Sequence, residues 1–168
     1  MYNVIVLAEQ AITEADATEV ASLHAAIEDQ RHYHVLIPCE NAAVRVETAL
    51  GSLAASEVLA APAVAANQAD IEEAQAEIEA DAQDAVAASV SALRALGAEA
   101  TGGFSSKDPI ESLEQVAREH SADEVIVLTR PHVIQEFLHL DWSSKARRRL
   151  GVPVLHLVEH EAPGPRAT

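Results

Sequence analysis

Four short runs of apolar and β-branched residues constrain this fold most: NVIVLA (3–8), HYHVLIP (32–38), EVIVL (124–128) and PVLHLV (153–158). The first and third runs are almost continuously apolar, as is typical of strands buried on both faces of a parallel sheet. A fifth, weaker strand is expected at 98–106, where Gly102 and Gly103 interrupt the pattern and indicate an edge strand or a bulge.

Helical patterns separate these strands. Thr13 and Asp16 resemble a capping box, which predicts a helix over 14–30. A longer apolar stripe predicts a helix over 68–96, about 43 Å long and extending beyond the sheet. Asp108 and Pro109 start a third helix, and a short one is expected near 142–150. The alternation predicts an α/β fold: a five-stranded, doubly wound parallel sheet with helices on both faces and strand order 3-2-1-4-5.

The chain has 168 residues, which suits one domain and is too short for a second domain of comparable size. We assign the domain to residues 1–160. Within it, residues 41–66 form an alanine-rich excursion that contains Gly51 and Pro62, and the end of the chain, 161–168, is expected to be a disordered tail.

The charge of the chain is strongly negative, at −16, and residues 1–128 hold 5 Lys/Arg against 23 Asp/Glu. Such a surface argues against nucleic acid and anionic membranes as partners, because both require positive charge. The start of the chain shows no apolar signal segment, and Cys39 is the only cysteine, which fits a reducing compartment. We therefore expect a cytoplasmic protein.

Three segments carry a family resemblance: VIVLAE near the start, DPIESLEQVAREHSADEVIVLTR in the middle and WSSKARRRLGVPVLHLV near the end. Together they resemble a universal stress protein domain. Nucleotide-binding members of that family have an aspartate after the first strand and the pattern G-x2-G-x9-G-S/T after the fourth. The matching positions in this chain are Glu9 for the aspartate, and Thr129, His132, Trp142 and Ser143 for the pattern.

Only Ser143 keeps the family's residue type in that pattern, and the three glycines are absent. Glycines let backbone N–H groups approach phosphate oxygens, whereas Thr129 and Trp142 carry bulk, and Pro131 removes a donor. Asp141 is suited to cap the helix N-terminus that a phosphate would use. ATP and AMP are therefore not expected as cofactors. The degenerate pocket, if it holds any ligand, consists of Glu9, Thr129, Arg130, His132, Trp142 and Ser143.

Three functions follow as hypotheses. The first is a universal-stress-like regulatory or interaction module that binds no ATP, performs no catalysis and acts on an unknown protein partner. The second is a nucleotide or small-anion binder that uses Arg130, His132 and Ser143. The third is a small hydrolase that uses Glu9 or the histidines. No metal site is expected, because the pair His139 and Asp141 matches no zinc-binding pattern.

The last strand also predicts a homodimer. Val154, His156 and Val158 point to one face of that strand, and Leu155 and Leu157 point to the other. At a sheet edge this strand would leave apolar side chains and unpaired backbone groups in water. The family resemblance favours the same strand as the dimer interface.

Overall fold

The computed structural model describes residues 1–39, 68–130 and 148–160; the 41–66 excursion and the 161–168 tail lie outside these ranges. The sheet contains five strands, β1 (Tyr2–Ala8), β2 (Arg31–Pro38), β3 (Glu99–Ser105), β4 (Glu124–Thr129) and β5 (Val154–Val158). The helices of these ranges that are longer than one turn are α1 (Glu14–Leu23), α3 (Gln68–Ala95) and α4 (Pro109–Glu119).

The sheet has the order β3-β2-β1-β4-β5, and every adjacent pair of strands is parallel. The central strand β1 pairs with β2 on one side and with β4 on the other, so Val6 lies between Val35 and Ile126. The predicted strand order and parallel sheet are confirmed. The winding direction reverses between β1 and β4, which is where such folds place their ligands, beyond the carboxyl ends of the strands.

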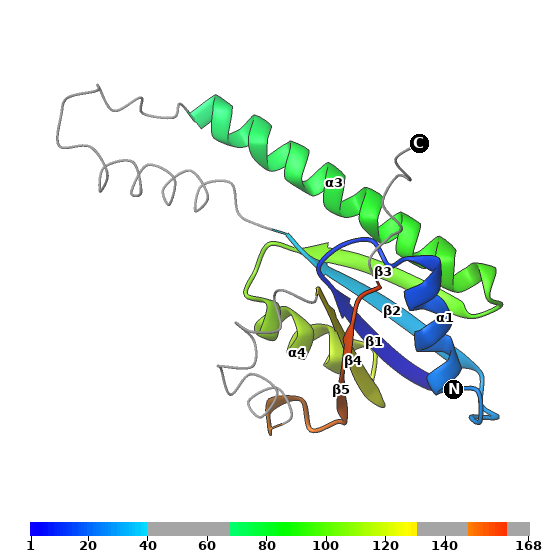
Figure 1. The fold of residues 1–168 in the computed structure, drawn as a ribbon. Coiled ribbons are helices and arrows are strands. Elements are labelled where there is room, and N and C mark those ends of the chain that lie inside the picture. The colour runs from blue at the N-terminus through cyan, green and yellow to red at the C-terminus, as the bar shows by residue number, and fades with distance from the viewer. Residues whose placement is uncertain (40–67, 131–147, 161–168) are drawn as a thin grey trace, which may run out of the picture.

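Helices cover both faces of the sheet. Helices α1 and α3 lie on one face and α4 on the other (Figure 1). The larger buried cluster contains Val6, Val20 and Leu93, and the smaller one contains Leu7 and Leu113. Side chains of β1 enter both clusters alternately, as the period of a strand requires. The continuous apolar pattern of the first run therefore reflects burial on two faces.

Helix α1 is shorter than its sequence predicts. The expected capping box forms, because the Thr13 side chain accepts from the Asp16 N–H and the Asp16 carboxylate accepts from the Thr13 N–H. The helix ends at Leu23, so the predicted end near residue 30 is wrong. His24 follows the last residue of the helix, and its side chain turns into the protein, where it is 2% exposed.

Strand β3 is more regular than its glycines suggest. It is an edge strand, as predicted, but its register with β2 runs without a bulge from Glu99 to Ser105. A Cβ atom on Gly102 would lie 2.8 Å from Cγ1 of Val86 and 3.1 Å from Cγ2 of Val90, both on α3. The glycine is therefore explained by the close approach of α3 to the strand.

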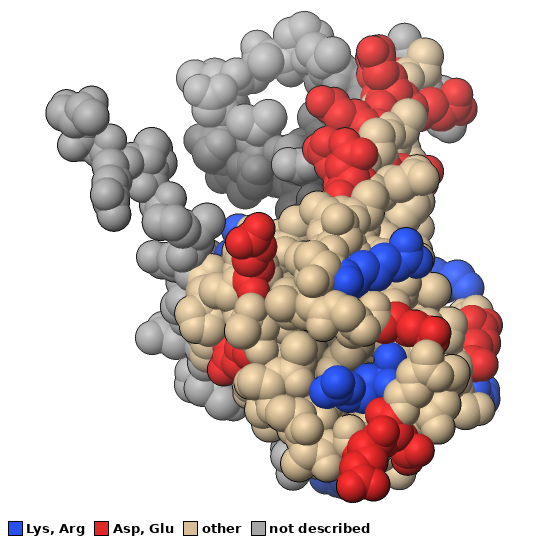
Figure 2. Space-filling view, turned by 90° about the vertical axis from the view of Figure 1, so that its right-hand side faces the viewer, with Lys and Arg blue, Asp and Glu red and all other residues tan. Residues whose placement is uncertain are grey.

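Helix α3 extends beyond the sheet, as its length predicts (Figure 1). Acidic side chains gather on this helix, and red side chains cluster at the upper right of Figure 2. The helix carries Asp70, Glu72, Glu73, Glu77, Glu79, Asp81 and Asp84, with Arg94 as its basic residue. None of the helices in the described ranges combines the length and the apolar character required to cross a membrane.

Candidate functional site

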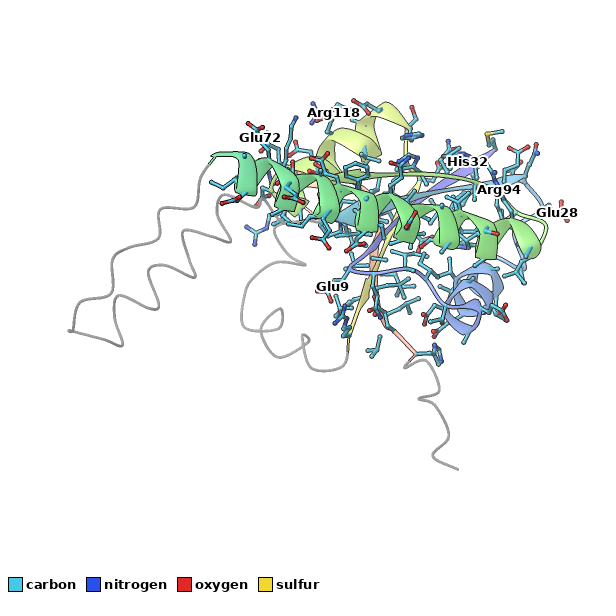
Figure 3. All side chains as sticks on the ribbon, turned by 90° about the horizontal axis from the view of Figure 1, so that it is seen from above. Glu9, Glu28, His32, Glu72, Arg94 and Arg118 are labelled. Carbon is cyan, nitrogen blue, oxygen red and sulfur yellow. The ribbon has the colours of Figure 1, made fainter. Side chains whose placement is uncertain are left out.

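The candidate site lies at the carboxyl edge of the sheet, where β1, β4 and β5 end side by side. Glu9 and Gln10 follow β1, Arg130 follows β4, and Glu159 and His160 follow β5. Figure 3 labels Glu9 at this edge. Parallel strands bring these five residues together although up to 151 positions separate them in the chain.

A hydrogen bond spans the edge from β1 to β5. Nε2 of Gln10 donates to Oε2 of Glu159 over 2.7 Å. The backbone N–H of Glu159 donates to the carbonyl oxygen of Thr129 over 2.9 Å, which holds this residue against the end of β4. Since β4 lies between β1 and β5, the contact between Gln10 and Glu159 crosses the point where the winding of the sheet reverses.

The carboxyl group of Glu159 is unusual because it is buried. Its residue is 6% exposed, and this burial raises the pKa of Glu159 to about 7. The hydrogen bond from Gln10 opposes this rise, whereas the negative charges of Glu9 and Asp16 add to it, and Arg130 lowers the pKa again. Oε1 of Glu159 and Nε of Arg130 are both buried without a hydrogen-bond partner among the described residues.

The structure describes three of the six predicted pocket residues, and it brings all three to this edge. Glu9 and Arg130 are half-buried. Thr129 is 2% exposed, and its hydroxyl lies 2.6 Å from Nε2 of His156 on β5. The other three residues, His132, Trp142 and Ser143, lie outside the described residues, as do Asp141 and Pro131.

Sequence reasoning missed Asp16, Glu19, Glu159 and His160. Asp16 is 1% exposed, and its Oδ1 accepts from the backbone N–H of His160 over 2.7 Å and lies 2.9 Å from the ring Nδ1 of the same residue. Burial alone would raise the pKa of Asp16, but hydrogen bonds from His160 and Thr13 outweigh it, so the pKa is lowered.

The sequence contains only part of the signal for the contact between Asp16 and His160. Asp16 was interpreted only as a cap of α1, a role it does perform. A cap uses local contacts and gives no indication of a second partner 144 positions away. The position of Glu159 directly after a predicted strand was the one available signal, because that position places it at the carboxyl edge.

Known structures share this fold. No protein-family model matches the sequence, and no curated protein matches it either. Among solved structures, the hypothetical protein MJ0577 is 11% identical, with a TM-score of 0.64 over 95% of this chain and 97% of its own. A universal stress protein family protein from Arabidopsis thaliana, with AMP bound, is 14% identical, with a TM-score of 0.56 over 99% and 97% of the two chains.

The universal stress protein of Archaeoglobus fulgidus is 15% identical, with a TM-score of 0.52 over 93% of both chains. Each of these three similarities spans nearly the full length of both proteins. The described chain therefore has the α/β fold of the universal stress proteins. At such low identity the similarity concerns the fold, and the chemistry of this chain has to be argued from its own residues.

Proposed function

We propose that this chain is a universal-stress-like regulatory or interaction module that binds neither ATP nor AMP at the carboxyl edge of its sheet and performs no catalysis. The observation that supports this most directly is the hydrogen bond between Gln10 and Glu159, which spans the ends of β1, β4 and β5. In folds of this class a nucleotide would have to occupy the same place.

Electrostatics support the same proposal. A bound phosphate needs backbone N–H donors or cations around it. Glu9 and Asp16 bring carboxylates close enough to Glu159 to affect its pKa, while Arg130 is the cation that opposes them. The hydroxyl of Thr129, which stands where the family pattern has glycine, lies 2.6 Å from Nε2 of the exposed His156 on β5. Among the described residues, phosphate oxygens would therefore meet negative charge and few free donors.

A second candidate function, binding of a nucleotide or small anion, is favoured by one observation. Nε of Arg130 is buried without a hydrogen-bond acceptor among the described residues, and an anion would provide one. The AMP bound to the Arabidopsis thaliana protein adds a precedent within the fold. No comparable observation among the described residues favours a hydrolase, so we do not propose one.

Isothermal titration calorimetry with ATP and with AMP separates the two candidates. We expect the wild-type chain to show no saturable binding up to about 1 mM nucleotide, and no stabilisation in a thermal-shift assay. Micromolar affinity that is lost in Arg130→Gln and kept in the exposed control Arg118→Gln would overturn the proposal and establish the anion-binding alternative. Glu9→Gln combined with Glu159→Gln tests the electrostatic argument, because removing two carboxyl groups should increase any residual affinity for AMP.

A further inference from the structure

Asp16, Glu19 and His160 form a cluster of three side chains, which we call the α1–β5 cluster, and it joins helix α1 to the chain after β5. Their candidate ligand atoms all lie within 4.8 Å of one another. Nδ1 of His160 is 2.9 Å from Oδ1 of Asp16 and 3.6 Å from Oε2 of Glu19. Asp16 and Glu19 lie about one turn apart on α1, and the fold brings His160 to them from 144 positions beyond Asp16.

These separations suit a shared metal ion. A four-coordinate ion with bonds of about 2.1 Å keeps neighbouring ligand atoms roughly 3.4 Å apart. The separations of 2.9 and 3.6 Å lie on either side of that value, so small side-chain rotations would place all three atoms around one ion. One imidazole nitrogen with two carboxylate oxygens is a donor set for Zn²⁺ or Mn²⁺, whereas Mg²⁺ and Ca²⁺ prefer oxygen ligands alone.

The cluster is held in place by further hydrogen bonds. Oδ2 of Asp16 accepts from the hydroxyl of Thr13 over 2.6 Å and from the Thr13 N–H over 3.2 Å, so Oδ1 faces His160. The backbone N–H of His160 donates to that Oδ1 and fixes the position of the residue after β5. Contacts of this kind orient the ligands of metal sites, and they limit the entropy lost on binding.

Ion pairs join His160 to both Asp16 and Glu19, but they leave one carboxylate oxygen of the cluster without a hydrogen bond. Oε2 of Glu19 is buried and has no hydrogen-bond partner among the described residues. Burying a carboxylate oxygen without a donor is costly, and a cation bound in the cluster would offset that cost at Glu19.

From this geometry we infer that the α1–β5 cluster binds one divalent transition-metal ion through Asp16, Glu19 and His160, and that solvent completes its coordination. Solvent has access, because the side chains of Glu19 and His160 are 38% and 54% exposed. The inference does not depend on the proposed function, since the cluster needs no nucleotide.

Zinc titration of the full-length, chelator-treated protein in nucleotide-free buffer tests the site. We expect one equivalent of Zn²⁺ to bind with a Kd below about 10 μM, and an equal concentration of Mg²⁺ not to compete. His160→Gln and Glu19→Gln should each weaken binding by more than about tenfold. Both side chains are partly exposed, so these variants are expected to fold; Asp16 is left unchanged because it caps α1.

Two matched controls distinguish this cluster from other carboxylates and imidazoles. Glu14→Gln changes an exposed carboxylate on the same helix, and His120→Gln changes the separate group of His32, His34 and His120; both should bind Zn²⁺ like the wild type. A second readout is the ring ¹⁵N shift of His160, which should move on adding one equivalent. Three results would each overturn the inference: no saturable binding at about 100 μM Zn²⁺, unchanged Zn²⁺ binding in His160→Gln, or loss of Zn²⁺ binding in His120→Gln.

Discussion

Nε2 of His24 lies 2.9 Å from Oε2 of Glu124, and this contact joins the end of α1 to the start of β4. The other ring nitrogen of His24 lies 3.0 Å from the hydroxyl of Tyr33 on β2. The Tyr2 hydroxyl donates to the same Oε2 of Glu124 over 3.1 Å. His24 is 2% exposed, so this group of polar side chains is buried in the core. It lies at the amino edge of the sheet, at the opposite end from the candidate site.

Replacing His24 by alanine should therefore destabilise the fold. The change leaves Glu124 and Tyr33 without their buried partner and opens a cavity, which should lower the free energy of unfolding by about 2–4 kcal/mol. Urea denaturation measures the loss. Leu23→Ala, at an adjacent side chain that is 45% exposed, is the control and should change the same quantity by less than about 0.5 kcal/mol. Equal effects at the two positions would contradict a structural role for the histidine.

The sequence predicted the sheet well because its signals were local and repeated. The runs at 3–8 and 124–128 are apolar at consecutive positions, and only a strand buried on two faces explains this in an α/β chain. The contacts of His24 and His160 could not be predicted in this way. Each depends on a partner at least 100 positions away, and a single histidine or carboxylate has no periodicity to reveal its direction.

The sequence pattern indicated that Gly102 interrupts a strand, whereas the structure explains this glycine by the close approach of α3. A substitution at Gly102 tests that explanation. Gly102→Ala would place a Cβ 2.8 Å from Val86 and 3.0 Å from the carbonyl oxygen of Val35, so either α3 or β2 must shift. We expect a loss of about 1–3 kcal/mol in the free energy of unfolding.

The next residue on the same strand supplies the control for this prediction. A Cβ on Gly103 meets no atom within 4 Å, so Gly103→Ala should be neutral to within about 0.5 kcal/mol or slightly stabilising. Denaturant unfolding of both variants makes the comparison. Shortening Val86 to alanine in the Gly102→Ala chain should recover part of the loss; if it recovers none, the clash with α3 is not the cause.

A group of histidines on the α4 side of the sheet predicts a pH dependence of stability. The pKa of His34 is lowered to about 4, first by burial and then by the charges of His120 and His32, while Glu119 opposes this shift. The rings of His34 and His120 have centroids 4.0 Å apart, and Nδ1 of His34 lies 2.9 Å from the Thr101 hydroxyl. His32 marks this group in Figure 3, away from Glu9.

Between about pH 4 and pH 6.5 the unfolded chain binds a proton at His34 that the folded chain does not. The contribution of His34 to stability is therefore complete above about pH 6.5 and is lost as the pH falls toward 4. Denaturation of the wild type and of His34→Gln across this window should show a shallower pH dependence for the variant. An NMR titration that places the His34 pKa at 6 or above would refute the prediction, whereas His120→Gln should raise that pKa.

The final prediction concerns β5, which we expect to form a homodimer interface. Among the described strands β5 is the last of the sheet and pairs with β4 alone. Leu155 and Leu157 pack against the larger core cluster, and Val154 is buried within its own subunit at 7% exposed. Of the three predicted interface residues, His156 and Val158 therefore remain available to a partner, and Val158 is 43% exposed.

A second copy that packs against this end of the sheet would cover the exposed side chain of Val158. Sedimentation velocity at about pH 7.5 and tens of micromolar protein should then show a dimer, and Val158→Lys should shift it toward monomer. Phe104→Lys is the matched control, because Phe104 is 37% exposed on β3, the opposite edge strand. If the wild type is a monomer under these conditions, the prediction of a homodimer is wrong. A dimer that is disrupted by Phe104→Lys alone would place the interface on β3, because a lysine disrupts pairing only at the edge where the two copies meet.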